Sequence, residues 1–167
     1  MKLKIGVISD THDHIENIIK AVKLFNEQGV AYVFHAGDYI APFVIPKALN
    51  GLKCKLFGVY GNNDGEILGL KKKFTEIGAT IEEGQLTVQI DNKKIALYHT
   101  LHAEIQSALT NSRKFEIIIF GHSHEASIEK VGDSLIINPG EACGYLTGKA
   151  TIGIIDLDKM DAEIITI

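Results

Sequence analysis

The chain has 167 residues and a formal net charge of −4 at pH 7, with 46% hydrophobic and 23% charged residues. These proportions are typical of a soluble globular domain, and the acidic balance argues against a surface built to attract a polyanion. No apolar run in the sequence approaches the ~20 residues that a helix needs to cross a bilayer. We therefore expect one domain over residues 1–167, with no membrane partner and no specific nucleic-acid binding.

The two cysteines and the first residues bear on the compartment. Cys54 lies in a strand-like run and Cys143 in a glycine-rich loop, so the pair does not form a disulfide framework. The chain enters a predicted strand at once, without the charged, apolar and small-residue segments of a signal peptide. We expect a cytoplasmic protein with two free thiols.

The first half of the chain alternates short apolar runs with amphipathic stretches. Runs rich in Val, Ile, Phe and Tyr predict strands, and apolar residues at helical spacing predict helices between them. The first helix is expected to follow an Asp13–Glu16 capping pattern and to end at Gly29. The expected order is a strand at 5–8, this helix, a strand at 31–36, a short helix to about Asn50, a strand at 55–60 and a helix at 66–77. This order favours parallel strands with right-handed crossovers.

The second half does not continue the regular alternation of strands and helices. Two runs at 86–90 and 94–98 flank Asp91-Asn92, which indicates a hairpin. A helix at 103–113, a strand at 116–120 and short strands at 127–131, 134–137, 151–157 and 162–167 follow. The mixture predicts an α/β (α+β) fold with two packed mixed β-sheets flanked by helices, an αββα sandwich. A single doubly wound sheet is the alternative.

Side chains that commonly bind metals follow directly after five of the predicted strands. The carboxyl ends of strands in α/β sheets are where such sheets bind ligands, so these side chains are expected to converge. They are Asp10 and His12, Asp38, Asn62, His99, and His122 and His124.

The types and spacing of these residues suit divalent transition metals. Asp10 and His12 are two residues apart, so both project to one side of an extended strand end, and His122 and His124 share this spacing. Asp38 follows a glycine that permits close approach to an ion, and its two oxygens can bridge two ions. Carboxylate, amide and imidazole donors without a thiolate favour Mn, Fe, Co, Ni or Zn over a structural zinc site.

Each segment taken alone also has an ordinary explanation. His99 could be a buried, hydrogen-bonded histidine, and Asn62 and Asp64 could be turn residues. His35 is expected to pack or to support the ligands, and Glu141 is expected at the rim of the site. The joint occurrence of all these segments after strands is what favours a metal site over chance.

The order Asp-x-His, Gly-Asp, Gly-Asn-x-Asp, His and Gly-His-x-His resembles the calcineurin-like metallophosphoesterase superfamily. The Asn138-Pro-Gly-Glu segment and the Gly144-Tyr-Leu-Thr-Gly segment resemble its small, single-domain prokaryotic phosphodiesterase branch. The resemblance implies an αββα fold and two metal ions bridged by Asp38. It implies that Asp10, His12, Asp38 and His124 hold one ion, and that Asp38, Asn62, His99 and His122 hold the other.

Two positions depart from the superfamily pattern. The superfamily usually has a histidine directly after the metal-binding asparagine, where it contacts phosphate and helps the leaving group, and this chain has Asn63. Thr100 stands where glycine is common. His102 lies three residues after His99 and could also reach a phosphate. Asn63 and His102 are therefore the candidate catalytic residues beside the ligands.

These features together predict a binuclear metal-dependent phosphoesterase, more specifically a phosphodiesterase acting on a small phosphodiester. The expected mechanism is in-line attack on phosphorus by a hydroxide shared between two divalent transition metal ions, with Mn or Ni favoured over Mg because imidazole ligands suit them. Two alternatives remain: a protein-interaction scaffold like the retromer subunit of the same fold, or a phosphomonoesterase. Assembly into a homo-oligomer is left open.

Overall fold

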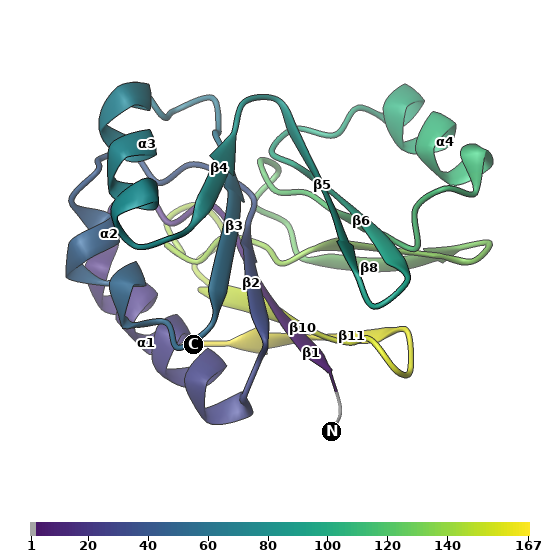
Figure 1. Ribbon diagram of the computed structural model, residues 1–167, viewed down its shortest axis with the longest axis horizontal. Coiled ribbons are helices and arrows are strands. Elements are labelled where there is room, and N and C mark those ends of the chain that lie inside the picture. The colour runs from purple at the N-terminus through teal and green to yellow at the C-terminus, as the bar shows by residue number, and fades with distance from the viewer. Residues whose placement is uncertain (1–2) are drawn as a thin grey trace.

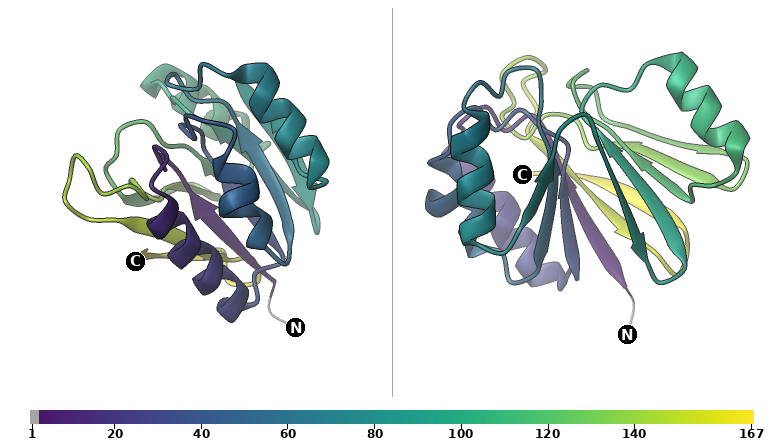
Figure 2. Two further views of the ribbon diagram at one scale, coloured as in Figure 1. Left: turned by 90° about the vertical axis from the view of Figure 1, so that its left-hand side faces the viewer. Right: turned by 45° about the horizontal axis from the view of Figure 1, so that its top comes forward.

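In the computed structural model, which describes residues 3–167, two mixed β-sheets pack face to face with helices on the outside (Figure 1). Three helices cover the outer face of the first sheet, and the fourth lies on the side of the second sheet (Figure 2). The predicted αββα arrangement is confirmed, and the alternative of a single doubly wound sheet is wrong.

The first sheet has the strand order β11-β10-β1-β2-β3-β4. Its parallel part is in register so that Ile8 pairs with His35 and His35 pairs with Gly58, which brings the carboxyl ends of three strands to one level. The sequence did not predict β4, which has only three residues. The strands are β1 (Lys4–Ile8), β2 (Tyr32–His35), β3 (Lys55–Val59) and β4 (Thr80–Glu82), with β10 (Thr151–Asp156) and β11 (Asp161–Thr166) antiparallel at the other side.

The second sheet has the order β5-β6-β7-β9-β8. The predicted hairpin is present, and Asp91 and Asn92 both have positive φ, 45° and 58°, as a tight type I′ turn requires. The strands are β5 (Gln85–Ile90), β6 (Lys93–Tyr98), β7 (Ile117–Ile119), β8 (Ser127–Val131) and β9 (Ser134–Asn138). Strands β6, β7 and β9 run parallel, so this sheet also has carboxyl ends at one edge.

The helices are α1 (Ile15–Gln28), α2 (Val44–Lys47), α3 (Ile67–Glu76) and α4 (Ala103–Ser112), with a 3₁₀ turn η1 (Leu49–Gly51) after α2. The predicted capping pattern at Asp13 is wrong. His14 caps α1 by accepting a bond from the backbone of Asn17, while the Asp13 carboxylate accepts a bond from the backbone of Ala41. None of these helices has the length and apolar content to cross a membrane.

The apolar side chains form two layers of core. One lies between the first sheet and helices α1 to α3, where Phe25 and Phe74 are fully buried. The other lies between the two sheets and includes Phe34 and Ile95. Because a sheet covered on both faces cannot shift without opening both layers, the ends of β1, β2 and β3 are held rigidly in place.

Gly29 gives a test of how α1 ends. It has a φ of 63°, and a Cβ added there would meet no heavy atom of the described residues within 4 Å, so a substitution probes backbone conformation alone. We expect Gly29→Ala to lower the free energy of unfolding by about 1 kcal/mol in urea titrations. The matched control is Gly65→Ala, which is equally open but lacks a positive φ. Equal destabilisation by both changes would contradict this explanation.

Candidate metal centre

The loops that follow β1 and β2 lie against each other at the carboxyl edge of the first sheet. The backbone amide of Asp10 donates to Gly37 O at 3.0 Å, and the amides of Thr11 and His12 donate to Asp38 O at 3.1 and 3.0 Å. These bonds fix the two carboxylate-bearing loops relative to each other before any side chain is considered.

Five of the seven predicted ligands have a left-handed backbone. The φ angles are positive at Asp10, His12, Asp38, His122 and His124, with values from 40° to 69°. Non-glycine residues rarely adopt this conformation, and Asp, Asn and His tolerate it better than most. Such conformations cluster at functional sites, where the surrounding structure holds them.

A first group of donors comprises Asp10, His12, Asp38 and His124, whose ligand atoms all lie within 4.8 Å of one another. His12 Nε2 is 3.4 Å from Asp38 Oδ2, and His124 Nε2 is 3.5 Å from Asp10 Oδ1. Asp10 Oδ1 and His12 Nε2 are buried without a hydrogen-bond partner among residues 3–167. Burial raises the pKa of Asp10. A cation in this position would satisfy both unpartnered atoms.

Glu141 sets the orientation of His124. The Nδ1 of His124 donates to the Glu141 carboxylate at 2.7 Å, which leaves the Nε2 lone pair directed at the cluster. Burial alone would raise the pKa of Glu141, but hydrogen bonds from His124, Thr147 and Leu146 outweigh it and lower the value to about 2. Glu141 is fully buried, so the expectation that it would lie at the rim was wrong.

A second group comprises Asn62, His99, His122 and again Asp38. Asn62 Oδ1 lies 2.8 Å from both His99 Nε2 and His122 Nδ1, and His99 Nε2 is 3.6 Å from Asp38 Oδ1. His99 Nδ1 faces the carbonyl oxygen of Ala36 at 2.7 Å, so this nitrogen carries the proton. The Nε2 lone pair of His99 then faces Asn62 Oδ1, and neither atom carries a hydrogen to donate. A cation between these two acceptors would stabilise the arrangement.

Asp38 lies between the two groups. Its Oδ2 faces His12 and its Oδ1 faces His99. Asn63 holds both oxygens, because its backbone N–H donates to Oδ1 at 2.9 Å and its side-chain amide donates to Oδ2 at 2.8 Å. The structure thus directs the Asn63 amide at a carboxylate of the cluster.

His102 differs from the other predicted site residues. It caps the N-terminus of α4 without a side-chain bond to the helix, and it is exposed. Within residues 3–167 its side chain has no hydrogen bond or ion pair to either group of donors. The structure therefore brings the seven predicted ligands and Asn63 together, and it leaves His102 outside these contacts.

Asp64 and His35 support the ligand loops from behind. The Asp64 carboxylate accepts bonds from the backbone amides of Asp38, Ile40 and Gly61, at 2.7 to 3.0 Å. His35 accepts a bond from Gly37 N at Nδ1 and stacks on Tyr39 with ring centroids 3.8 Å apart. Burial lowers the pKa of His35 well below its usual value, with smaller electrostatic contributions from His99 and His12, so this ring stays neutral.

Two glycines permit the close packing of these loops. A Cβ at Gly61 would collide with the Asp38 carboxylate, and a Cβ at Gly121 would collide with the Ser9 hydroxyl, which itself donates to Asp10. These contacts with neighbouring loops explain why glycine precedes Asn62 and His122.

Cys143 also lies beside the first group. Its Sγ is within 4.8 Å of ligand nitrogens of His12 and His124, and it donates to Glu141 at 3.2 Å. Burial and the Glu141 carboxylate raise the pKa of Cys143 to about 12. The thiol is therefore neutral, and the donor set near it remains one of carboxylate, amide and imidazole groups.

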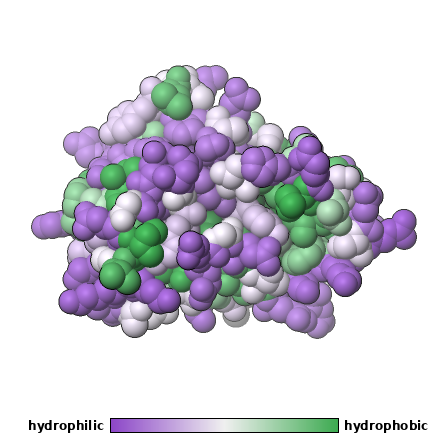
Figure 3. All heavy atoms as spheres, turned by 90° about the horizontal axis from the view of Figure 1, so that it is seen from above, coloured by the Kyte–Doolittle hydropathy of each residue, from purple (hydrophilic) through white to green (hydrophobic). Residues whose placement is uncertain are grey.

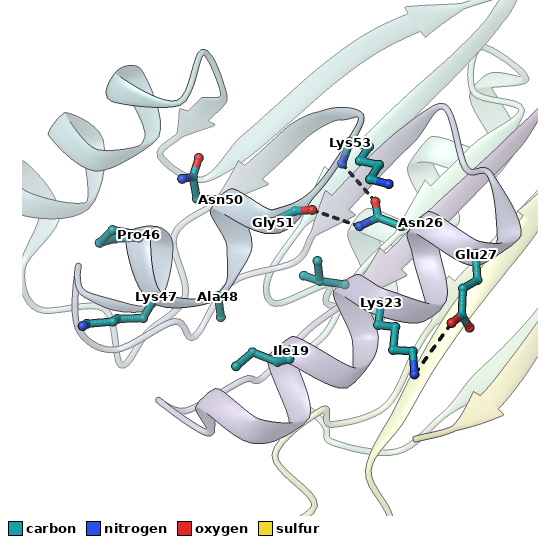
Figure 4. Close-up of a pocket in the computed structure, with 11 residues that line it drawn as sticks. Ile19, Lys23, Asn26, Glu27, Pro46, Lys47, Ala48, Asn50, Gly51 and Lys53 are labelled. Carbon is teal, nitrogen blue, oxygen red and sulfur yellow. Dashed lines mark hydrogen bonds and ion pairs between the residues drawn. The ribbon is translucent and has the colours of Figure 1, made fainter.

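A groove of about 650 Å³ between α1 and the α2–η1 segment is separate from this cluster (Figure 4). Three of its polar side chains, those of Asn26, Lys23 and Glu27, have hydrogen-bond or ion-pair partners. Asn26 donates to Gly51 O and accepts from Lys53 N, and Lys23 pairs with Glu27. The residues that line this groove include no histidine, aspartate or cysteine, and their one glutamate pairs with Lys23. The two groups of donors are therefore the better candidate for chemistry.

Known proteins with similar sequences and folds agree with this geometry. A family model described as the calcineurin-like phosphoesterase superfamily domain matches residues 3–160. A phosphodiesterase of Methanocaldococcus jannaschii is 43% identical over 160 residues, which cover 95% of this chain and 96% of the relative. A solved archaeal phosphodiesterase superposes with a TM-score of 0.93 at 42% identity, over 99% of this chain and 100% of that one.

The fold also occurs in more distant proteins. Vacuolar protein sorting 29 from Cryptosporidium parvum superposes with a TM-score of 0.65 at 17% identity, over 99% of this chain and 97% of that one. This distant likeness shows a shared fold alone. The family match over nearly the whole chain is far more specific, and on this basis the chain belongs to the calcineurin-like phosphoesterase superfamily.

Proposed function

We propose that this protein is a binuclear metal-dependent phosphodiesterase that hydrolyses small phosphodiesters. One observation carries the proposal: two groups of side chains suited to metal binding converge where loops from the carboxyl edges of the two sheets meet, and both groups include the Asp38 carboxylate. A relative with 43% identity over nearly the full length of both chains is named a phosphodiesterase, which supports the choice of diesters.

The assignment of ligands follows the two groups. Asp10, His12, Asp38 and His124 would hold one ion, and Asp38 would share the second ion with three further residues, Asn62, His99 and His122. Unpartnered buried atoms support the first site, and facing lone pairs support the second. Divalent ions, when bound here, supply positive charge for the phosphate oxygens and acidify the attacking water.

The other residues of the site act through the ligands. Asn63 holds both oxygens of Asp38 in place, and Asp64 fixes the backbone on which Asp38 stands. Glu141 fixes the tautomer of His124, and the carbonyl of Ala36 does the same for His99. A pre-positioned ligand set loses little entropy when an ion binds, and such outer partners typically contribute about 10- to 100-fold in metal affinity or activity.

A scaffold role without catalysis is the weaker candidate. It rests on a likeness to distant structures such as vacuolar protein sorting 29, at 17% identity, and no feature of the donor groups favours it. All seven predicted ligands are present and close together, whereas a scaffold needs none of them. A phosphomonoesterase differs from a diesterase only in how the pocket meets the substrate, and a substrate panel separates the two.

Removal of the shared carboxylate tests the binuclear arrangement. We expect Asp38→Asn to lower metal content and to reduce diester hydrolysis by roughly 100-fold or more, because both ions lose a charged ligand. Asn62→Ala should mainly weaken one ion and leave the other measurable by elemental analysis after dialysis. If Asp38→Asn still bound two ions tightly and turned over substrate at a near-normal rate, the proposal that Asp38 bridges both ions would be contradicted.

The choice of metal gives a second test. We expect chelation to abolish hydrolysis of a diester panel, and Mn or Ni to restore it better than Mg. Four of the seven proposed ligands are imidazoles, whereas Mg prefers oxygen ligands and keeps its waters. The panel should include matched monoesters, since faster hydrolysis of monoesters would favour the alternative activity. Full activity with Mg alone would count against the ligand set.

Asn63 occupies the position where the superfamily pattern has a histidine. We expect the parent enzyme to depend steeply on the pKa of the leaving group, because an amide cannot protonate the departing alcohol. Asn63→His should speed the slow substrates more than the fast ones, since general-acid help is typically worth roughly 10²- to 10⁴-fold. The measurement is the slope of log rate against leaving-group pKa.

The matched control is Asn63→Ala, which removes the amide bond to Asp38 without adding an acid. It should lower all rates by a similar factor and leave the slope unchanged. If the parent and Asn63→His have equally shallow slopes, another group already supplies the proton, and His102→Ala then tests whether that group is His102.

A further inference from the structure

The loop between β9 and β10 combines a rigid backbone with exposed apolar side chains. Tyr145 is 62% exposed and Leu146 is 74% exposed, although Glu141, Ala142 and Cys143 in the same loop are buried. Figure 2 shows this yellow-green loop extending from the body of the molecule in its left view. Figure 3, seen from the top of Figure 1, shows hydrophobic side chains in separate groups on a mainly hydrophilic face.

The loop is held by hydrogen bonds that do not involve its exposed side chains. The buried Glu141 carboxylate accepts bonds from the backbone amides of Leu146 and Thr147 and from the Thr147 hydroxyl. Gly144 and Gly148 have φ angles of 71° and 73°, which permit the turns on both sides. The Tyr145 side chain takes no part in these hydrogen bonds, so they give no reason for an exposed aromatic residue at this position.

The same hydrogen bonds connect the loop to the first group of donors. Glu141 also accepts the bond from His124, and the backbone amide of Cys143 donates to Asp10 O at 3.1 Å. Cys143 Sγ lies within 4.8 Å of ligand nitrogens of His12 and His124. Tyr145 comes two residues after Cys143, so the exposed part of the loop begins beside the proposed first metal site.

Two pairs of aromatic rings connect the segment after β1 with later loops. The rings of His124 and His12 have centroids 5.3 Å apart, and those of His14 and Tyr145 have centroids 5.5 Å apart. His14 is fixed in turn, because its ring accepts a bond from the backbone of Asn17 in the first turn of α1. The Tyr145 ring thus lies against His14 on one side and is exposed to solvent on the other.

We propose that the face of Tyr145, supported by His14, stacks against a planar aromatic group esterified to the phosphate of the substrate. This inference rests on the proposed phosphodiesterase function and deepens it by naming a substrate class. Such a group is an aryl ring or a nucleobase, since both present a π face that stacks on tyrosine with little dependence on sequence or substituent.

The test uses binding of phosphonates, whose P–C bond is not hydrolysed, to the metal-loaded protein by calorimetry. We expect phenylphosphonate to bind about tenfold more tightly than methylphosphonate. Tyr145→Ala should remove this preference and leave methylphosphonate binding unchanged, whereas Tyr145→Phe should retain the preference because the ring remains. A nucleoside 5′-phosphonate, measured in parallel, shows whether a nucleobase stacks as well as a phenyl ring does.

Leu146→Ala is the matched control, since it removes an exposed apolar side chain from the same loop and keeps the backbone bond to Glu141. It should bind phenylphosphonate as the parent does. Wild-type preference for phenylphosphonate in Tyr145→Ala would overturn the inference. So would an equal loss of both phosphonates, because that would place the effect at the metal cluster.

Different results would contradict the aromatic subsite and the phosphodiesterase function on which it rests. A metal-loaded protein that hydrolyses diesters but binds both phosphonates equally would remove the aromatic subsite and leave the phosphodiesterase proposal standing. A protein that binds metal yet hydrolyses no diester and binds neither phosphonate would overturn both.

Discussion

The buried carboxylate of Asp64 connects the two loops on which the proposed metal centre depends. It accepts three backbone N–H groups, two from the loop after β2 and one from the loop after β3. Burial raises the pKa of Asp64, while these three bonds favour its charged form. These bonds add to the pairing of β2 with β3 and to the two bonds from Asn63 to Asp38, and together they fix the backbone that carries Asp38 relative to the backbone that carries Asn62.

The strands themselves supply the rest of this rigidity. β1, β2 and β3 pair in register and have apolar layers on both faces, so their carboxyl ends present the loops at one level. Sequence alone predicts this much, because apolar runs followed by Asp, Asn and His are local signals. The same holds for the Asp91-Asn92 hairpin and for Gly29 at the end of α1, where the residue type decides the local backbone.

What sequence could not predict depends on partners distant along the chain. Asp13 looks like a helix cap, yet the backbone of Ala41 engages its carboxylate and His14 caps the helix in its place. Glu141 looks like a loop residue, yet it is buried beneath His124, 17 residues away. Asn63 reaches Asp38 from 25 residues away. No local pattern encodes these pairings, because the fold creates them.

The left-handed backbone at five of the proposed ligands restricts how this site can change. A carboxylate, amide or imidazole on a short side chain tolerates that conformation, whereas a β-branched or long side chain adds strain to any loss of chemistry. Replacement of an aspartate by glutamate would therefore alter reach and backbone energy together. Few residue types are therefore suitable at these five positions in a redesign of metal selectivity. Asn62 and His99 lack a positive φ, so more residue types can replace them without backbone strain.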